Sequence, residues 1–345
     1  MTFSKNGFIL DPKVMQTNED ECPHNKFSDE RDECEVFRRD LDDIRRESIP
    51  GKGNILKRIG SYDDPSRASV GPSLLHFPEV PAHLRFNKYV LGHYRPLLDI
   101  RGCLASLTYW HNETINILTH AVPIIFIISL IPQMLPWDTI TIPFLPVIHV
   151  AACLAPWVGS TFYHLFMCHQ MGRTVYAFLL KFDLFGIWFT QTLGALVTIC
   201  SAIHCFDYQT KRLLLSFYLL ICMLCLYQAM TVSTTWGRRF AFTAPFSIRV
   251  FCLLLRLSPW GGGAPNTTYY VIMQDVLAIL GGYIGAVNIP EKWFPGKVDL
   301  IFNSHHIMHV LVVAAVYHMH KAAELDLVWM SSDTACQNII FHQNL

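Results

Sequence analysis

Residues Asn303–His320 read NSHHIMHVLVVAAVYHMH, three histidines that run directly into a long apolar segment. On an α-helix, His305 and His309 lie four residues apart and therefore share one face. Two imidazoles at this spacing can bind one metal ion, and zinc accepts histidine nitrogen readily. His306 points about 100° away from His305 and needs a different role. Because histidines at a helix start are often only solvated, the metal hypothesis requires a third ligand from elsewhere in the chain.

The composition is that of a membrane protein. Of the 345 residues, 52% are hydrophobic and 16% are charged, and the mean hydropathy is +0.29. Soluble domains contain about 25% charged residues, so these values predict a polytopic membrane protein. The formal net charge is zero, which argues against a nucleic-acid partner. The first residues have no sustained apolar core, so we expect no signal peptide, and the first membrane helix then directs insertion.

Seven apolar segments follow, each close to the roughly 20 residues that span a bilayer. The expected spans are 114–135, 142–167, 174–198, 212–232, 242–260, 269–289 and 303–323. Pro245, Arg249 and Arg256 interrupt the fifth. Since a charge at mid-membrane is costly, we expect Arg249 either to snorkel or to face the bundle interior. The pattern predicts an all-α fold, a seven-transmembrane helix bundle.

The chain divides into four parts around these spans. Residues 1–65 are dense in charged side chains and are expected to be a disordered cytosolic tail. Residues 66–113 form a juxtamembrane segment whose mixture of aromatic, basic and apolar residues is typical of a short interfacial helix. Residues 114–330 form the transmembrane domain, and residues 331–345 form a short C-terminal tail.

Positive charge near the short loops predicts the orientation. The N-terminal side of the membrane carries more lysine and arginine than the opposite side. The two sets are Arg95, Arg101, Arg173, Arg238, Arg239, Lys292 and Lys297 against Lys211, Arg212, Arg256 and Lys321. We therefore expect a cytosolic N-terminus and an extracellular or lumenal C-terminal tail. On that outer side, Cys200 and Cys205 could form a disulfide, because such bonds persist in oxidising compartments.

Alternation of seven spans brings the end of the second, the start of the third and the start of the seventh to one membrane face. The second span ends with Ser160 and His164, again four residues apart, and the third carries Asp183 in an otherwise apolar run. His164, His305 and His309 then lie at comparable depth and offer three nitrogen donors. Three protein ligands with a fourth position open to water are typical of catalytic zinc, whose bound water reaches a pKa of about 7.

The remaining candidate residues receive roles from the same chemistry. Asp183 is costly to bury alone, so we expect it to hydrogen-bond the bound water or a ligand histidine, and in a catalytic site it is the general base. Ser160 would orient the water or donate to a developing oxyanion. Arg249 is a candidate to bind a fatty-acid carboxylate. The alternative is a structural zinc ion that only ties the helices together.

Other polar residues are expected to lie outside this chemistry. Glu113, Asn116 and His120 begin the first span and are predicted to form interhelical hydrogen bonds. His318 and His320 lie near the opposite end of the last span, too far along it to join the other histidines. The candidate site is therefore confined to one membrane face.

Several stretches resemble a known family. They are YRP (94–96), HNETINILTH (111–120), STFYHLFMCH (160–169), KFD (181–183) and IPEKWFPGKVDLIFNSHHIMHVLVVAA (289–315). In these motifs, and throughout the seven-helix region, the chain resembles the progestin and adipoQ receptors, which include the adiponectin receptors. One departure is that His306 replaces the glutamine of the usual SHQ motif. The charged N-terminal tail lies outside the resemblance.

The resemblance implies a cytosolic N-terminus and a zinc ion just inside the cytosolic face. It implies that His164, His305 and His309 are the ligands, with Ser160 and Asp183 beside them. The wider superfamily includes alkaline ceramidases, which implies hydrolysis of a lipid amide.

Two functions remain open. The first is a lipid-sensing receptor that hydrolyses a ceramide-like amide through a zinc-activated water. The second is a non-catalytic signalling receptor or scaffold with a structural zinc, which would signal to cytosolic partners through its N-terminal tail. Either function implies contact with membrane lipids, such as ceramide or a fatty acid, in the Golgi or plasma membrane. A transporter is disfavoured because the acidic and histidine residues gather at one end only.

Overall fold

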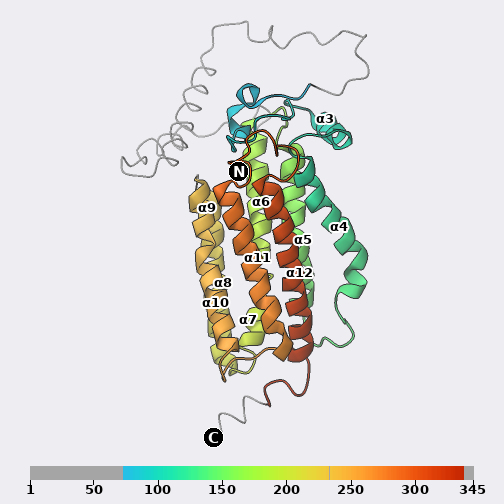
Figure 1. Ribbon diagram of the computed structural model, residues 1–345. Helices are drawn as coiled ribbons and strands as arrows, with labels where there is room; N and C mark the ends of the chain where they lie inside the picture. The colour runs from blue at the N-terminus through green and yellow to red at the C-terminus, as the bar shows by residue number, and fades with distance from the viewer. Residues whose placement is uncertain (1–72, 233, 338–345) are drawn as a thin grey trace, which may run out of the picture. The chain divides into compact units, whose positions relative to one another are not determined.

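The structure is a computed structural model that describes residues 73–232 and 234–337 (Figure 1). Its long helices are α4 (Thr114–Met134), α5 (Leu145–Phe166), α6 (Arg173–Thr192), α8 (Tyr208–Thr231), α10 (Thr243–Arg256), α11 (Thr268–Val287) and α12 (Ser304–Met330). The short ones are η3 (Phe77–Glu79), η4 (Ala82–Leu84), α3 (Ile100–Ala105), η5 (Ser106–Thr108), α7 (Leu196–Ala202), α9 (Thr235–Ala241) and η6 (Pro265–Thr267). The all-α prediction is confirmed. The expected tail at 1–65 and the end of the C-terminal tail lie outside the described residues.

The long helices follow one another in the order predicted for the spans, and most of them run roughly parallel (Figure 1). Within the described residues, five helices are long and apolar enough to cross a membrane: Thr114–Met134, Leu145–Phe166, Arg173–Ala202, Tyr208–Thr231 and Pro265–Val287. The other two long elements are α9 with α10, and the 27-residue α12. The predicted interruption of the fifth span is real, because the helix breaks at Phe242 and Pro245 lies in the first turn of α10, where a missing N–H is tolerated.

Close packing of α5 against α6 positions one side of the candidate site. A Cβ atom on Gly159 would lie 2.9 Å from the carbonyl oxygen of Phe182, and one on Gly186 would lie 2.5 Å from that of Ala155. These separations are below ordinary contact, so only glycine allows the two helices to approach this closely. The contact brings the α6 turn that carries Asp183 next to the α5 turn at Gly159.

The segment before the first span caps the end of α5. Arg95 is buried and donates hydrogen bonds to the carbonyl oxygens of His164, at 2.5 Å, and Leu165, at 2.9 Å. These are carbonyl groups that a helix end leaves without partners. Helix α3 follows and exposes Ile100 and Leu104. Its short length and exposed apolar side chains suit the predicted interfacial helix.

The loop between α11 and α12 is fastened by two buried carboxylates. Asp299 accepts hydrogen bonds from the backbone N–H groups of Leu91, at 3.0 Å, and Gly92, at 2.7 Å. Glu291 accepts from the Asn87 amide at 3.0 Å and from the backbone N–H of Ser304 at 2.6 Å. These bonds hold the first turn of α12, and hence its histidines, against the segment before the first span.

The opposite end of the bundle carries a disulfide that links Cys205 to Cys336. The pairing of Cys200 with Cys205, which the sequence allowed, is therefore not formed. Cys200 is a free thiol on α7, where it packs against an apolar cluster that includes Leu327.

Candidate metal centre

Helices α5 and α12 bring together the three histidines that the sequence singled out. His164 lies near the end of α5, and His305 and His309 lie in the first two turns of α12. One ring nitrogen from each lies within 4.8 Å of the others, and the Nε2 atoms of His164 and His305 are 3.3 Å apart. Two nitrogens bound to one tetrahedral zinc ion lie about 3.3 Å apart. The residues therefore fit such an ion.

Two partners on α4 or at its start orient these rings. A carboxylate oxygen of Glu113 lies 2.7 Å from Nδ1 of His164, and the Thr119 hydroxyl lies 3.0 Å from Nδ1 of His309. Asn116 donates to the same Glu113 oxygen at 2.7 Å. A partner on one ring nitrogen fixes the tautomer and leaves the other nitrogen free to bind a metal.

Ser160 and Asp183 lie on the α5 and α6 turns that pack together. The Ser160 side chain is buried, and its hydroxyl has no hydrogen-bond partner among the described residues. Asp183 is close enough to His164 for their charges to interact. A buried hydroxyl without a partner is costly, so Ser160 fits a site completed by a group outside the protein chain.

Comparisons with known proteins identify the family of the chain. The family described as Haemolysin-III related matches residues 108–320. The human protein named "Progestin and adipoQ receptor family member 4" is 39% identical over 261 residues, which cover 75% of this chain and 95% of the relative. The chain belongs to the progestin and adipoQ receptor family.

Other relatives of this family member are more distant. The "Adiponectin receptor protein" of Drosophila melanogaster is 28% identical over 279 residues, 72% of this chain and 59% of the relative. "Heptahelical transmembrane protein 1" of Arabidopsis thaliana is 26% identical over 285 residues, 74% of this chain and 82% of the relative. The resemblance seen in the sequence motifs is thus confirmed.

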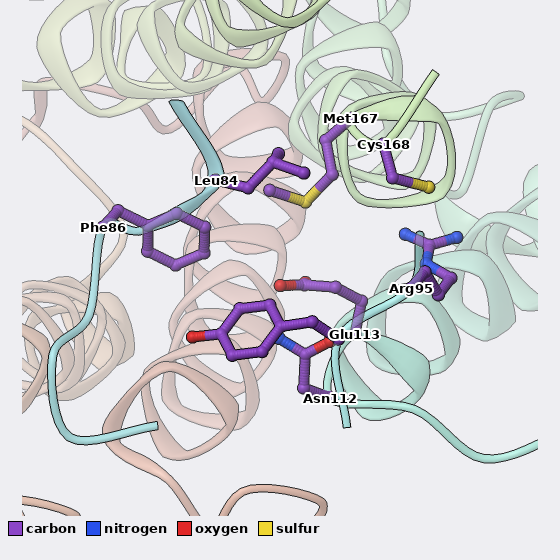
Figure 2. A pocket seen from close by; sticks show the side chains of 8 residues that line it. Leu84, Phe86, Arg95, Asn112, Glu113, Met167 and Cys168 are labelled. Carbon is purple, nitrogen blue, oxygen red and sulfur yellow. The ribbon is translucent and has the colours of Figure 1, made fainter. Parts of the chain in front are cut away.

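In this progestin and adipoQ receptor family protein, Glu113 also borders a small hollow (Figure 2). The pocket is lined by Leu84, Phe86, Tyr94, Arg95, Asn112, Glu113, Met167 and Cys168. Burial opposes ionisation of Glu113, but its hydrogen bonds with His164 and Asn116 outweigh burial and hold its pKa well below the usual range. Figure 2 shows the Glu113 carboxylate pointing into the pocket, so it lies between this hollow and the His164 ring.

Sequence reasoning gave Glu113 a purely structural role and did not single out Thr119. The usable signal was the spacing of Glu113, Asn116 and His120, which places all three on one helical face. His120 stacks on His309 with ring centroids 3.7 Å apart. The face is therefore turned toward the metal centre, as polar residues buried in a membrane bundle usually are.

Arg249 forms its hydrogen bonds and its ion pair with residues other than the three histidines. It is buried and forms an ion pair with Asp275 of α11 and a hydrogen bond with the side chain of Gln191 of α6. Of the two expected positions, facing the bundle interior is observed and snorkelling is not. A fatty-acid carboxylate would have to compete with Asp275 for this guanidinium group.

Proposed function

We propose that this protein is a zinc-binding membrane receptor that hydrolyses a ceramide-like lipid amide at the membrane face. The observation that carries the proposal is the convergence of one nitrogen each from His164, His305 and His309. When bound there, zinc would polarise the amide carbonyl and lower the pKa of a water molecule. The contacts of Glu113 and Thr119 with the ring Nδ1 atoms support metal binding over simple solvation of the histidines.

The depth of the cluster supports an amide substrate that carries long chains. His305 is the second residue of α12, and His164 lies two residues before the end of α5. The histidines therefore sit within about two turns of the helix ends, close to the level of lipid headgroups. The amide of a ceramide lies just below its headgroup, so its acyl and sphingoid chains would extend along the apolar helices.

Asp183 and Ser160 supply the proton chemistry of the proposed reaction. Asp183 takes a proton from the attacking water and passes it to the amine nitrogen as the amide C–N bond breaks. The unpaired Ser160 hydroxyl donates to the carbonyl oxygen as negative charge develops on it. The products are a fatty acid, whose carboxylate is the proposed ligand of Arg249, and a sphingoid base.

Lipid mass spectrometry on the full-length protein in lipid nanodiscs tests the enzymatic proposal. Ceramide turnover by the wild type should exceed that of Asp183→Asn and His305→Ala by at least 100-fold, as expected for loss of a general base or a metal ligand. Lys181→Gln, which removes an exposed charge two residues from Asp183, is the matched control. Equal turnover in all four proteins would exclude the enzymatic function.

A structural zinc ion in a signalling receptor is the second candidate. It is favoured by the fact that the three histidines join α5 to α12, which would make the ion a clamp. In that case His164→Ala lowers thermal stability, whereas Asp183→Asn leaves signalling intact. Deletion of residues 1–65 would abolish signalling to cytosolic partners and leave the metal content unchanged. Both candidates are consistent with residence in the Golgi or plasma membrane, which imaging of the tagged full chain distinguishes.

A further inference from the structure

A second cluster of side chains that could hold a metal ion lies farther along the same two helices, in the first half of α5 and the second half of α12. His149 and Cys153 lie one turn apart on α5, and His320 lies on α12. One donor atom from each lies within 4.8 Å of the others. The separation from His149 to His164 on α5 equals that from His305 to His320 on α12. Members of the two clusters that share a helix therefore lie about 16–22 Å apart along its axis.

Two of the three donor distances match those around one metal ion, and the third is below 4.8 Å. Nε2 of His149 lies 3.1 Å from Nδ1 of His320 and 3.5 Å from Sγ of Cys153. Around a tetrahedral ion with ordinary bond lengths, two nitrogens lie about 3.3 Å apart and a nitrogen and a sulfur about 3.6 Å apart. Both observed distances are within about 0.2 Å of these values.

Hydrogen bonds among the three side chains leave at least one of these atoms without a good partner. Nε2 of His149 faces both other donor atoms, yet it carries either one proton or one lone pair. His149 and Cys153 are fully buried, so water does not supply the missing partner from bulk. A single cation at the shared point would accept a lone pair from all three atoms.

The net charge of the complex and the sulfur ligand favour copper(I) over zinc. A thiolate and two neutral imidazoles leave a net charge of +1 around Zn²⁺ but form a neutral complex with Cu⁺, and net charge inside a bilayer is costly. Glu324, one turn beyond His320, is already paired with Lys321 at 2.8 Å. Thiolate and thioether sulfur favour copper(I), and Met134 and Met319 pack in the same apolar cluster as Cys153.

We propose that His149, Cys153 and His320 form a second metal site that binds copper(I). The site joins α5 to α12 at the end that carries the disulfide, away from the zinc-type histidine cluster. Neither the enzymatic nor the signalling function requires it. His320 is only partly buried, so the ion can enter past this side chain.

Metal content of the full-length protein in lipid nanodiscs tests the proposal. The protein is incubated with copper(I) under reducing conditions and with zinc, freed of excess ions and analysed for both metals. The wild type should retain one copper per chain. Cys153→Ser and His320→Gln should each reduce bound copper at least tenfold and leave the zinc content unchanged. X-ray absorption at the copper edge should show a sulfur neighbour in the wild type that is absent from Cys153→Ser.

Cys225→Ser is the matched control, because it removes another buried free thiol, on α8, outside the cluster. It should retain copper. His320→Gln alters a partly exposed residue, so it still tests copper binding at this cluster if Cys153→Ser fails to fold. Unchanged copper in a folded Cys153→Ser or His320→Gln protein would overturn the site. Loss of zinc instead of copper in these variants would overturn the assignment of the ion.

Discussion

Substitution of Glu113 by glutamine tests whether the His164 ring is held for metal binding. Glu113 is buried, and its carboxylate lies 2.7 Å from Nδ1 of His164. Glutamine has nearly the same shape and its amide oxygen still accepts a hydrogen bond. The variant therefore removes the negative charge and leaves the packing and the ring orientation largely intact.

The expected loss follows from the charge on the imidazole. Metal binding at Nε2 makes the His164 ring electron-poor, so the carboxylate stabilises the bound state more than the free state. A hydrogen bond to a charged group contributes about 1.5–3 kcal/mol, against about 0.5–1.5 kcal/mol for a neutral one. The difference is about 1–2 kcal/mol, or about 5–30-fold in zinc affinity at roughly 1.4 kcal/mol per tenfold.

Competition with a zinc-binding dye, on protein in nanodiscs, measures this affinity. Glu113→Gln should bind zinc about 5–30-fold more weakly than the wild type. Glu324→Gln, at the far end of α12, removes an equal charge from a partly buried ion pair and should not change the affinity. Wild-type affinity in Glu113→Gln, or equal loss in both variants, would refute the proposed role of the carboxylate.

Two further predictions concern packing and the disulfide. Gly186→Ala should lower the free energy of unfolding by about 1–3 kcal/mol, because its Cβ atom would lie 2.5 Å from the Ala155 carbonyl oxygen. Gly282→Ala should not, because nothing lies within 4 Å of a Cβ atom at that position. Differential scanning fluorimetry compares the two variants, and equal melting temperatures would contradict the close contact of α5 with α6. Cys336→Ser should lower stability by about 2–4 kcal/mol through loss of its disulfide. Cys200→Ser should not lower stability in this way, because Cys200 is a free thiol. Thiol labelling of the unfolded, unreduced protein followed by mass spectrometry should therefore label Cys200, and an unlabelled Cys200 would contradict the Cys205–Cys336 pairing.

The spans and the histidine cluster could be predicted from the sequence because they depend on local regularities. Apolar length sets the spans, and helical periodicity with strict alternation of direction sets the depth of His164, His305 and His309. The roles of Glu113 and Thr119 could not be predicted, because they depend on how α4 is rotated against α5 and α12. The rotation of α4 is determined by side-chain packing, and the hydropathy of the sequence does not predict that packing.

Contacts between residues far apart in the chain also could not be predicted from the sequence. Cys205 has a nearer candidate partner in Cys200, but that residue lies within α7, and the chain returns only at Cys336. The cluster of His149, Cys153 and His320 was missed for a related reason. His320 lies too far along the last span to join His305 and His309, and its neighbours in the cluster, His149 and Cys153, come from the first half of α5.

The most direct test of the central claim is the zinc content of the purified full-length protein. We predict one zinc ion per chain in the wild type, and its loss in His164→Ala, His305→Ala and His309→Ala alike. His306→Gln should retain the ion, because His306 points away from the cluster and contacts Asn303 instead. A wild type without zinc, or ligand variants that retain it as fully as His306→Gln does, would contradict the account.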